Sequence, residues 1–179
     1  SIYQHEDWAV LQKPGTRDPW HPEEWQAYFH EETWAIFNAS DQIWGSFVWN
    51  MFDFAADHRD EGDRQGINDK GLVTHDRTVK KDAFFFYKAA WTEEPVVHIT
   101  SRRYNPRPVG AATVKVYANV EAVELFVDDR SMGKGQRDGV VFTWPPITLE
   151  PGSVAIEARA EFAGQPASER ISWEVVENL

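Results

Sequence analysis

The sequence contains no cysteine among its 179 residues. Disulfide bonds, thiolate catalysis and cysteine-based zinc sites are therefore excluded. It also has no hydrophobic run that approaches the ~20 residues of a membrane-spanning helix. Positive charge is scarce, because 18 Lys and Arg stand against 29 Asp and Glu for a net charge of −11. Phosphate binding requires a basic surface, so we expect neither nucleic acid nor an anionic membrane as a partner.

Short motifs of cofactor and nucleophile chemistry are also missing. The sequence has no G-x-S-x-G elbow, no P-loop and no G-x-G-x-x-G stretch. His58 and His75 could act as bases or metal ligands, but neither has a partner at a spacing typical of metal motifs. The sequence therefore predicts no cofactor and no metal site.

Aromatic residues are abundant, at 14% of the chain, and nine of them are Trp. A tryptophan ring more often fills a hydrophobic core, and it can also stack on the apolar face of a sugar. Seven of the nine lie in the first 91 residues: Trp8, Trp20, Trp25, Trp34, Trp44, Trp49 and Trp91.

The chain changes character near Pro95, which predicts two domains, residues 1–93 and 94–179. The first part has an α/β pattern. Its expected elements are a helix over 22–38, a buried strand over 43–49, a long polar loop from 57 to about 68 and a helix over 81–91.

The second part shows short apolar and polar alternation that predicts β-strands. Turn residues such as Pro151 and Gly152 separate these runs. Six or seven short strands in roughly 85 residues are typical of an antiparallel, immunoglobulin-like β-sandwich. Its expected segments are 97–102, 113–118, 123–127, 140–144, 154–160 and 171–175.

Candidate functional residues gather where the predicted strand 43–49 ends. Functional side chains of α/β barrels lie at the carboxyl ends of strands, so Trp49 and Asp53 are expected to face a site. Arg64, Asn68 and Lys70 follow in the loop, and together suit an anionic or polyhydroxylated ligand. The alternative is a solvated loop whose cations pair with neighbouring acidic side chains.

Three longer motifs resemble glycoside hydrolase family 2, the β-galactosidase and β-glucuronidase family. Residues 45–54, GSFVWNMFDF, are similar to the last strand of its barrel, and residues 66–77, GINDKGLVTHDR, to the segment after it. Residues 80–88, KKDAFFFYK, resemble its final barrel helix. The resemblance implies the C-terminal segment of a TIM (β/α)8 barrel followed by an immunoglobulin-like sandwich.

The resemblance also implies a retaining mechanism with two catalytic glutamates on earlier barrel strands. We expect both glutamates upstream of Ser1, so the chain carries no catalytic residue of its own and is inactive alone. Its expected partners are a carbohydrate substrate and the remainder of the glycosidase polypeptide. The exposed strand edges of a partial barrel also make a homo-oligomer possible, and the family alone suggests a periplasmic or extracellular location.

Substrate-binding roles follow from the same resemblance. Trp49 matches the tryptophan at the floor of the sugar subsite, while Asn68 and Lys70 match the Asn-x-Lys that β-glucuronidases use to hold the uronate carboxylate. Arg64 stands where a supporting arginine occurs, and for Asp53 we favour a structural acceptor role over a catalytic one. The wider motifs rank β-galactosidase first and β-glucuronidase second, and a non-catalytic carbohydrate-binding module is the alternative from another class.

Overall fold

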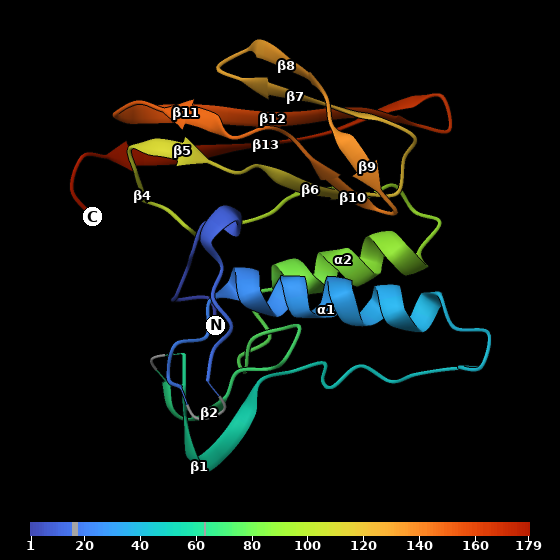
Figure 1. Cartoon of the computed structure of the whole chain (residues 1–179), viewed down its shortest axis with the longest axis vertical. Coiled ribbons are helices and arrows are strands. Elements are labelled where there is room, and N and C mark those ends of the chain that lie inside the picture. Colours follow the sequence, from blue (N-terminus) through green and yellow to red (C-terminus); the bar gives the residue numbers. More distant parts are fainter. Residues whose placement is uncertain (16–17, 63) are drawn as a thin grey trace. The chain divides into compact units, whose positions relative to one another are not determined.

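The structure is a computed structural model that describes residues 1–15, 18–62 and 64–179. Its chain divides into two compact units (Figure 1). Unit 1 comprises Ser1–Glu6 and Val10–Phe84, and unit 2 comprises Asp7–Ala9 and Phe85–Leu179. No described helix is long and apolar enough to cross a membrane. The domain boundary expected between residues 93 and 94 stays a prediction.

Helices form at both places where the sequence predicts them. Helix α1 (Glu23–Asn38) follows Pro22, which occupies the N-cap, and the acidic pair Glu23 and Glu24 lies in its first turn. Negative charge at that end is favoured by the helix dipole. Helix α2 (Asp82–Trp91) likewise begins with an acidic residue and ends with Lys88 in its last turn. A short 3₁₀ turn, η1 (Trp8–Val10), precedes them.

The predicted polar loop is a β-hairpin instead. Strands β1 (Phe54–Glu61) and β2 (Arg64–Asn68) pair antiparallel. Glu61 stands opposite Arg64 in the register. Gly62 adopts φ +60° at the turn, a conformation that favours glycine. The loop prediction was wrong because charge density was taken as a sign of irregular structure.

The predicted strand over 43–49 was wrong as well. Within the described residues this segment has no strand partner, and Trp44 and Phe47 are 99% and 102% exposed. An apolar run becomes a buried strand only where neighbouring strands accept its backbone hydrogen bonds. The described residues of unit 1 therefore form one hairpin and no closed barrel.

Unit 2 is built from β-strands in three sheets. The four-stranded sheet has the order β3-β6-β10-β9, made of Val97–Ile99, Lys115–Ala118, Val141–Thr143 and Gln136–Asp138. The five-stranded sheet has the order β4-β13-β12-β7-β8, made of Arg107–Pro108, Gln165–Val176, Gly152–Phe162, Val123–Val127 and Arg130–Lys134. Strands β11 (Ile147–Leu149) and β5 (Gly110–Ala112) form a separate pair.

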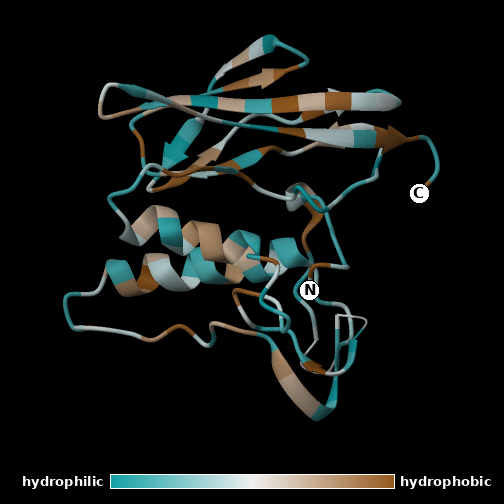
Figure 2. Ribbon diagram, turned by 180° about the vertical axis from the view of Figure 1, so that it is seen from behind, coloured by the Kyte–Doolittle hydropathy of each residue, from teal (hydrophilic) through white to brown (hydrophobic). Residues whose placement is uncertain are grey.

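The sequence-based strand segments of unit 2 agree with this arrangement. All the pairs among its described strands are antiparallel except β13 with β4, which is parallel. Along β12, buried Val154, Ile156 and Ala158 alternate with more exposed residues. Figure 2 shows the same alternation of hydrophobic and hydrophilic residues on the long strands. Both larger sheets contribute to one core that includes Val116, Leu125 and Trp173.

Candidate functional site

A pocket of about 400 Å³ opens in unit 1. Helix α1 supplies one side of it with Trp25, Gln26, Phe29 and His30. The spacing of these residues, one and four positions apart, puts them on neighbouring turns of the helix. The other described lining residues are Ser1, Lys13, Pro14, Gly15, His21, Pro22, Trp49, Arg59, Asp69 and Lys70. Aromatic rings and three cationic side chains thus share one cavity.

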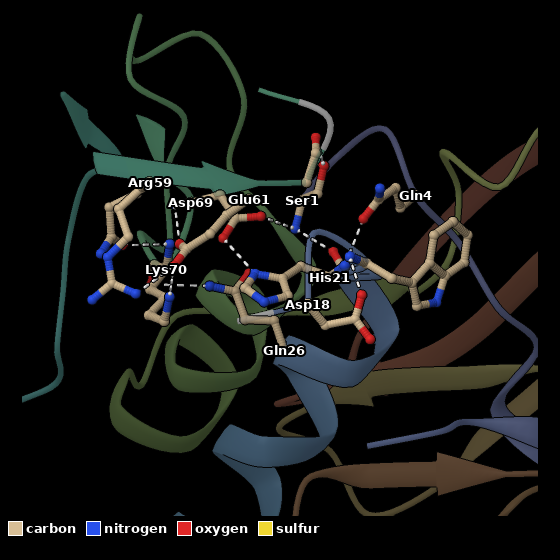
Figure 3. A network of polar contacts seen from close by, with 12 residues as sticks. Ser1, Gln4, Asp18, His21, Gln26, Arg59, Glu61, Asp69 and Lys70 are labelled. Atoms are coloured by element: carbon tan, nitrogen blue, oxygen red, sulfur yellow. Dashed lines mark hydrogen bonds and ion pairs between the residues drawn. The ribbon is translucent and has the colours of Figure 1, made fainter. Parts of the chain in front are cut away.

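The cations of the hairpin side converge on one carboxylate. Lys70 Nζ lies 2.6 Å from Glu61 Oε1, and Arg59 Nη1 donates to the same oxygen at 3.0 Å (Figure 3). Glu61 Oε2 accepts the backbone N–H of Asp69 at 3.3 Å. The Glu61 side chain is 6% exposed, whereas those of Lys70 and Arg59 are 44% and 40% exposed. The cationic groups therefore reach solvent while their shared partner is buried.

Asp69 forms the second ionic contact of the pocket. Its Oδ1 lies 3.0 Å from His21 Nδ1. Burial acts to raise the pKa of Asp69, but the His21 hydrogen bond and the nearby Lys81 charge hold that pKa well below its usual range. Ligand atoms of His21, Glu61 and Asp69 lie within 4.8 Å of one another. Glu61 also contacts Lys70 and Arg59, so the three residues belong to a wider network of polar contacts.

The side chains of three residues form hydrogen bonds with the backbone on either side of Lys70. Gln26 Nε2 donates to the carbonyl oxygens of Lys70 and Gly71, each at 3.0 Å. Lys81 Nζ donates to the carbonyl oxygen of Asp69 at 2.6 Å and to Asp53 Oδ1 at 2.8 Å. Asp53 Oδ1 also accepts the N–H of Gly71 at 2.8 Å. These bonds lie on both sides of Lys70 in the sequence and restrain its position.

Gly71 itself is required by close packing. A Cβ at this position would lie 2.1 Å from the backbone nitrogen of Asp53 and 2.2 Å from the carbonyl carbon of Phe52. Backbone atoms cannot give way as a flexible side chain can. Burial raises the pKa of Asp53, and the Lys81 charge opposes that rise. Lys81 is fully buried, so each of the two groups depends on the other for compensation.

The structure brings some of the predicted site residues together and separates others. Trp49, 68% exposed, and Lys70 both line the pocket. Asn68 is 5% exposed, and its Oδ1 accepts the backbone N–H of Lys70 at 3.2 Å. Arg64 and Asp53 instead line a second cavity of about 170 Å³. The Arg64 guanidinium lies 4.8 Å from the centre of the Tyr3 ring and donates to the Tyr3 hydroxyl at 3.0 Å.

Sequence reasoning missed Arg59, His21 and the α1 aromatic residues, and it offered Glu61 only as one of the acidic partners of the loop cations. Arg59 and Glu61 are two positions apart in β1, so their side chains share one face of the strand. This two-residue spacing indicates a shared face only once the segment is recognised as a strand. Of the two histidines considered as chemical groups, His58 is exposed and contacts Asp57 at 3.4 Å, and His75 lines the second cavity.

His30 gives the pocket a testable pH response. Burial, with a smaller contribution from the Lys81 charge, lowers the pKa of His30 from 6.5 to about 4. The unfolded chain binds this proton at higher pH than the folded chain, so the contribution to stability is complete above pH 6.5 and is lost as the pH falls toward 4. The expected loss is about 3 kcal/mol.

The measurement is the free energy of unfolding in urea for the native chain and for His30→Gln between pH 4 and pH 7. The free energy of unfolding of the native chain, relative to that of His30→Gln, should be larger at pH 7 than at pH 4. His58→Gln, at a side chain that is 73% exposed, serves as the control. A difference that does not vary with pH would contradict the buried, neutral state of His30.

Comparisons with known proteins relate this chain to glycosidases. A β-glucuronidase of Bacteroides fragilis is 42% identical over 99% of this chain and 26% of its own length. The β-galactosidase BoGH2A of Bacteroides ovatus is 28% identical over 80% of this chain and 18% of its own length. The crystal structure of a Bacteroides uniformis β-glucuronidase superimposes with a TM-score of 0.81 at 28% identity, covering 98% of this chain and 21% of that one. Residues 110–166 match a domain of unknown function, DUF4982.

The chain is thus related to glycosidase enzymes, of which it spans about a quarter or less. It corresponds to the C-terminal region of the β-glucuronidases and β-galactosidases of glycoside hydrolase family 2. In those proteins the equivalent of this chain is one part of a larger polypeptide.

Proposed function

We propose that this chain forms one wall of the sugar-binding pocket in a retaining exo-glycosidase that acts on terminal β-glucuronides. The observation that carries the proposal is the pairing of an exposed indole ring, Trp49, with the partly exposed cations Lys70 and Arg59 in one pocket. An aromatic face suits the C–H groups of a sugar ring. A cation held by a rigid backbone suits a carboxylate on that ring.

Each residue has a separate task in this proposal. Trp49 stacks on the sugar, Lys70 donates to the uronate carboxylate, and Asn68 holds the backbone N–H of Lys70. We further propose that the two catalytic glutamates come from residues outside 1–179, as the family resemblance implies. The retaining reaction needs those two carboxyl groups about 5–5.5 Å apart. The chain's own residues bind and orient the substrate without taking part in bond cleavage.

A β-galactosidase is the second candidate. It is favoured by the similarity to the Bacteroides ovatus β-galactosidase and by the Glu61 carboxylate, which already offsets one of the two cations. The sequence motifs rank this candidate first. We place the glucuronidase first because a neutral galactoside gives Lys70 and Arg59 no charge to bind.

The test compares an aryl β-glucuronide with an aryl β-galactoside as substrates of the native protein isolated from its source. The glucuronide should be hydrolysed with the higher kcat/KM. Lys70→Met should raise the KM for the glucuronide about 10- to 100-fold, because a hydrogen bond to a charged group contributes about 1.5–3 kcal/mol. The KM for the galactoside should not change.

Lys134→Met, at an exposed residue of β8, is the matched control and should change neither substrate's KM. Preference for the galactoside would replace the first candidate by the second. Sugar binding that persists in residues 94–179 alone, measured by calorimetry, would instead favour a carbohydrate-binding module.

A further inference from the structure

Glu61 holds a position that the proposed substrate carboxylate would share. It is the last residue of β1 and is 5% exposed. Its Oε1 contacts Lys70 Nζ at 2.6 Å and Arg59 Nη1 at 3.0 Å, as Figure 3 shows. The second oxygen is anchored by the backbone N–H of Asp69 at 3.3 Å. The carboxylate is therefore fixed to the protein and faces both hairpin cations.

This arrangement changes the charge that a ligand meets. Lys70 and Arg59 together carry two positive charges, and Glu61 leaves one of them uncompensated. The Asp69 carboxylate contacts His21 rather than Lys70 or Arg59. Lys70 is an ammonium with three N–H donors, and the Glu61 contact takes one of them. A sugar carboxylate can thus bind Lys70, but it does so beside a like charge that opposes its approach.

We infer that Glu61 is a specificity-determining residue, which sets how strongly the pocket prefers an acidic sugar over a neutral one. The inference rests on the proposed function and adds to it. Glu61 weakens the attraction of Lys70 and Arg59 for a uronate, while a neutral sugar of the same shape is indifferent to it. A pocket of this design accepts acidic sugars with moderate preference and still admits neutral ones.

The expected size of the effect follows from the exposure of the cations. Lys70 and Arg59 are partly exposed, so solvent screens their interactions and the change stays well below that of a fully buried ion pair. Removing the Glu61 charge should therefore strengthen uronate binding by about three- to tenfold. Added salt should reduce this difference, because it screens exposed charges.

The experiment uses two probes that share a sugar ring and differ in charge, D-glucuronate and D-glucuronamide. Calorimetry gives the Kd of each for the native protein and for Glu61→Gln. The glutamine keeps an acceptor for the Asp69 N–H and removes the charge. We expect the Kd for glucuronate to fall about three- to tenfold and the Kd for glucuronamide to stay the same.

Two further variants control the result. Asp57→Asn removes one negative charge from the same strand at a side chain that is 103% exposed, and should leave both Kd values unchanged. Glu61→Asp keeps the charge and should keep the native ratio of the two Kd values. Thermal unfolding of each variant verifies that it is folded.

The possible failures are distinguishable. If the native protein binds glucuronate and Glu61→Gln leaves the ratio of the two Kd values unchanged, or weakens glucuronate binding, the inference about Glu61 is overturned and the proposed function stands. If the native protein binds neither probe, the proposed function fails, and the inference with it.

Discussion

Lys81→Met is expected to lower the free energy of unfolding of unit 1 by about 3–5 kcal/mol, the usual result of removing one partner of a buried ion pair. Lys81 is fully buried and binds Asp53 Oδ1 and the carbonyl oxygen of Asp69. Methionine fills a similar space but donates no hydrogen bond. Both oxygens would lose this donor, and the Asp53 charge would lose its compensation.

Two variants isolate this cause. Lys80→Met replaces the neighbouring exposed lysine and should have little effect. Asp53→Asn combined with Lys81→Met removes both charges, and its amide oxygen can still accept the N–H of Gly71. This double variant should recover part of the lost stability, because it leaves no buried charge unpaired.

Amide hydrogen exchange measures the effect in unit 1 separately from unit 2. The N–H of Leu72, bonded to the carbonyl oxygen of Asn50, should exchange faster in Lys81→Met, while Ala158 in β12 should not. The loss of unfolding free energy in Lys81→Met should grow as the pH rises above 3.8, the ordinary pKa of an aspartate. Above that pH the unpaired carboxyl group of Asp53 has to ionise in a buried site. Unchanged protection at Leu72 would show that Lys81 does not support this segment.

Trp173→Ala should destabilise unit 2 by about 3–5 kcal/mol, the usual cost of truncating a large buried side chain. Trp173 is 0% exposed and lies in the core formed by both larger sheets. The Arg107 guanidinium, itself 2% exposed, lies 3.7 Å from the centre of the tryptophan ring. The truncation would leave a cavity and remove the ring against which Arg107 packs.

Urea unfolding of Trp173→Ala, Trp173→Phe and Trp44→Ala distinguishes the loss of buried side-chain volume from the mere replacement of a tryptophan. Trp173 Nε1 is buried without a hydrogen-bond partner in the part of the chain that the structure describes, so phenylalanine loses no hydrogen bond there and should cost less than alanine. Trp44 is 99% exposed, and its replacement should change stability by no more than about 0.5 kcal/mol. Equal losses for Trp44→Ala and Trp173→Ala would contradict the position of the core.

Local patterns predicted much of the fold. The first helix was readable because its start signal, Pro22 with two glutamates, agrees with the spacing of its apolar residues. The second was readable from the spacing of its aromatic residues alone. The strands of unit 2 were readable because one face is buried, which produces alternation such as that of β12. The segment 43–49 could not be predicted correctly, because strand formation depends on partners that a local pattern does not contain.

The candidate site was predictable only in part. Trp49 and Lys70 were found through their position and residue type, and both line the pocket. The separation of Arg64 and Asp53 from them depends on contacts with Tyr3 and Lys81, which are distant in sequence. The pairing of Lys70 with Glu61 agrees with the alternative interpretation of the loop, in which its cations pair with neighbouring acidic residues. The second contact of Glu61, with Arg59, was not predicted.

The unequal exposure of the tryptophans gives the molecule an intrinsic optical probe. Trp44 and Trp49 are 99% and 68% exposed, whereas Trp144 and Trp173 are 5% and 0% exposed. The first pair therefore emits from a polar surrounding at long wavelength, and the second from an apolar one at short wavelength. A sugar, strand or polypeptide that covers residues 43–49 should therefore shift part of the long-wavelength emission to shorter wavelength, while Trp91, 54% exposed, keeps emitting in that band. The binding of such a partner can thus be followed by fluorescence without a label.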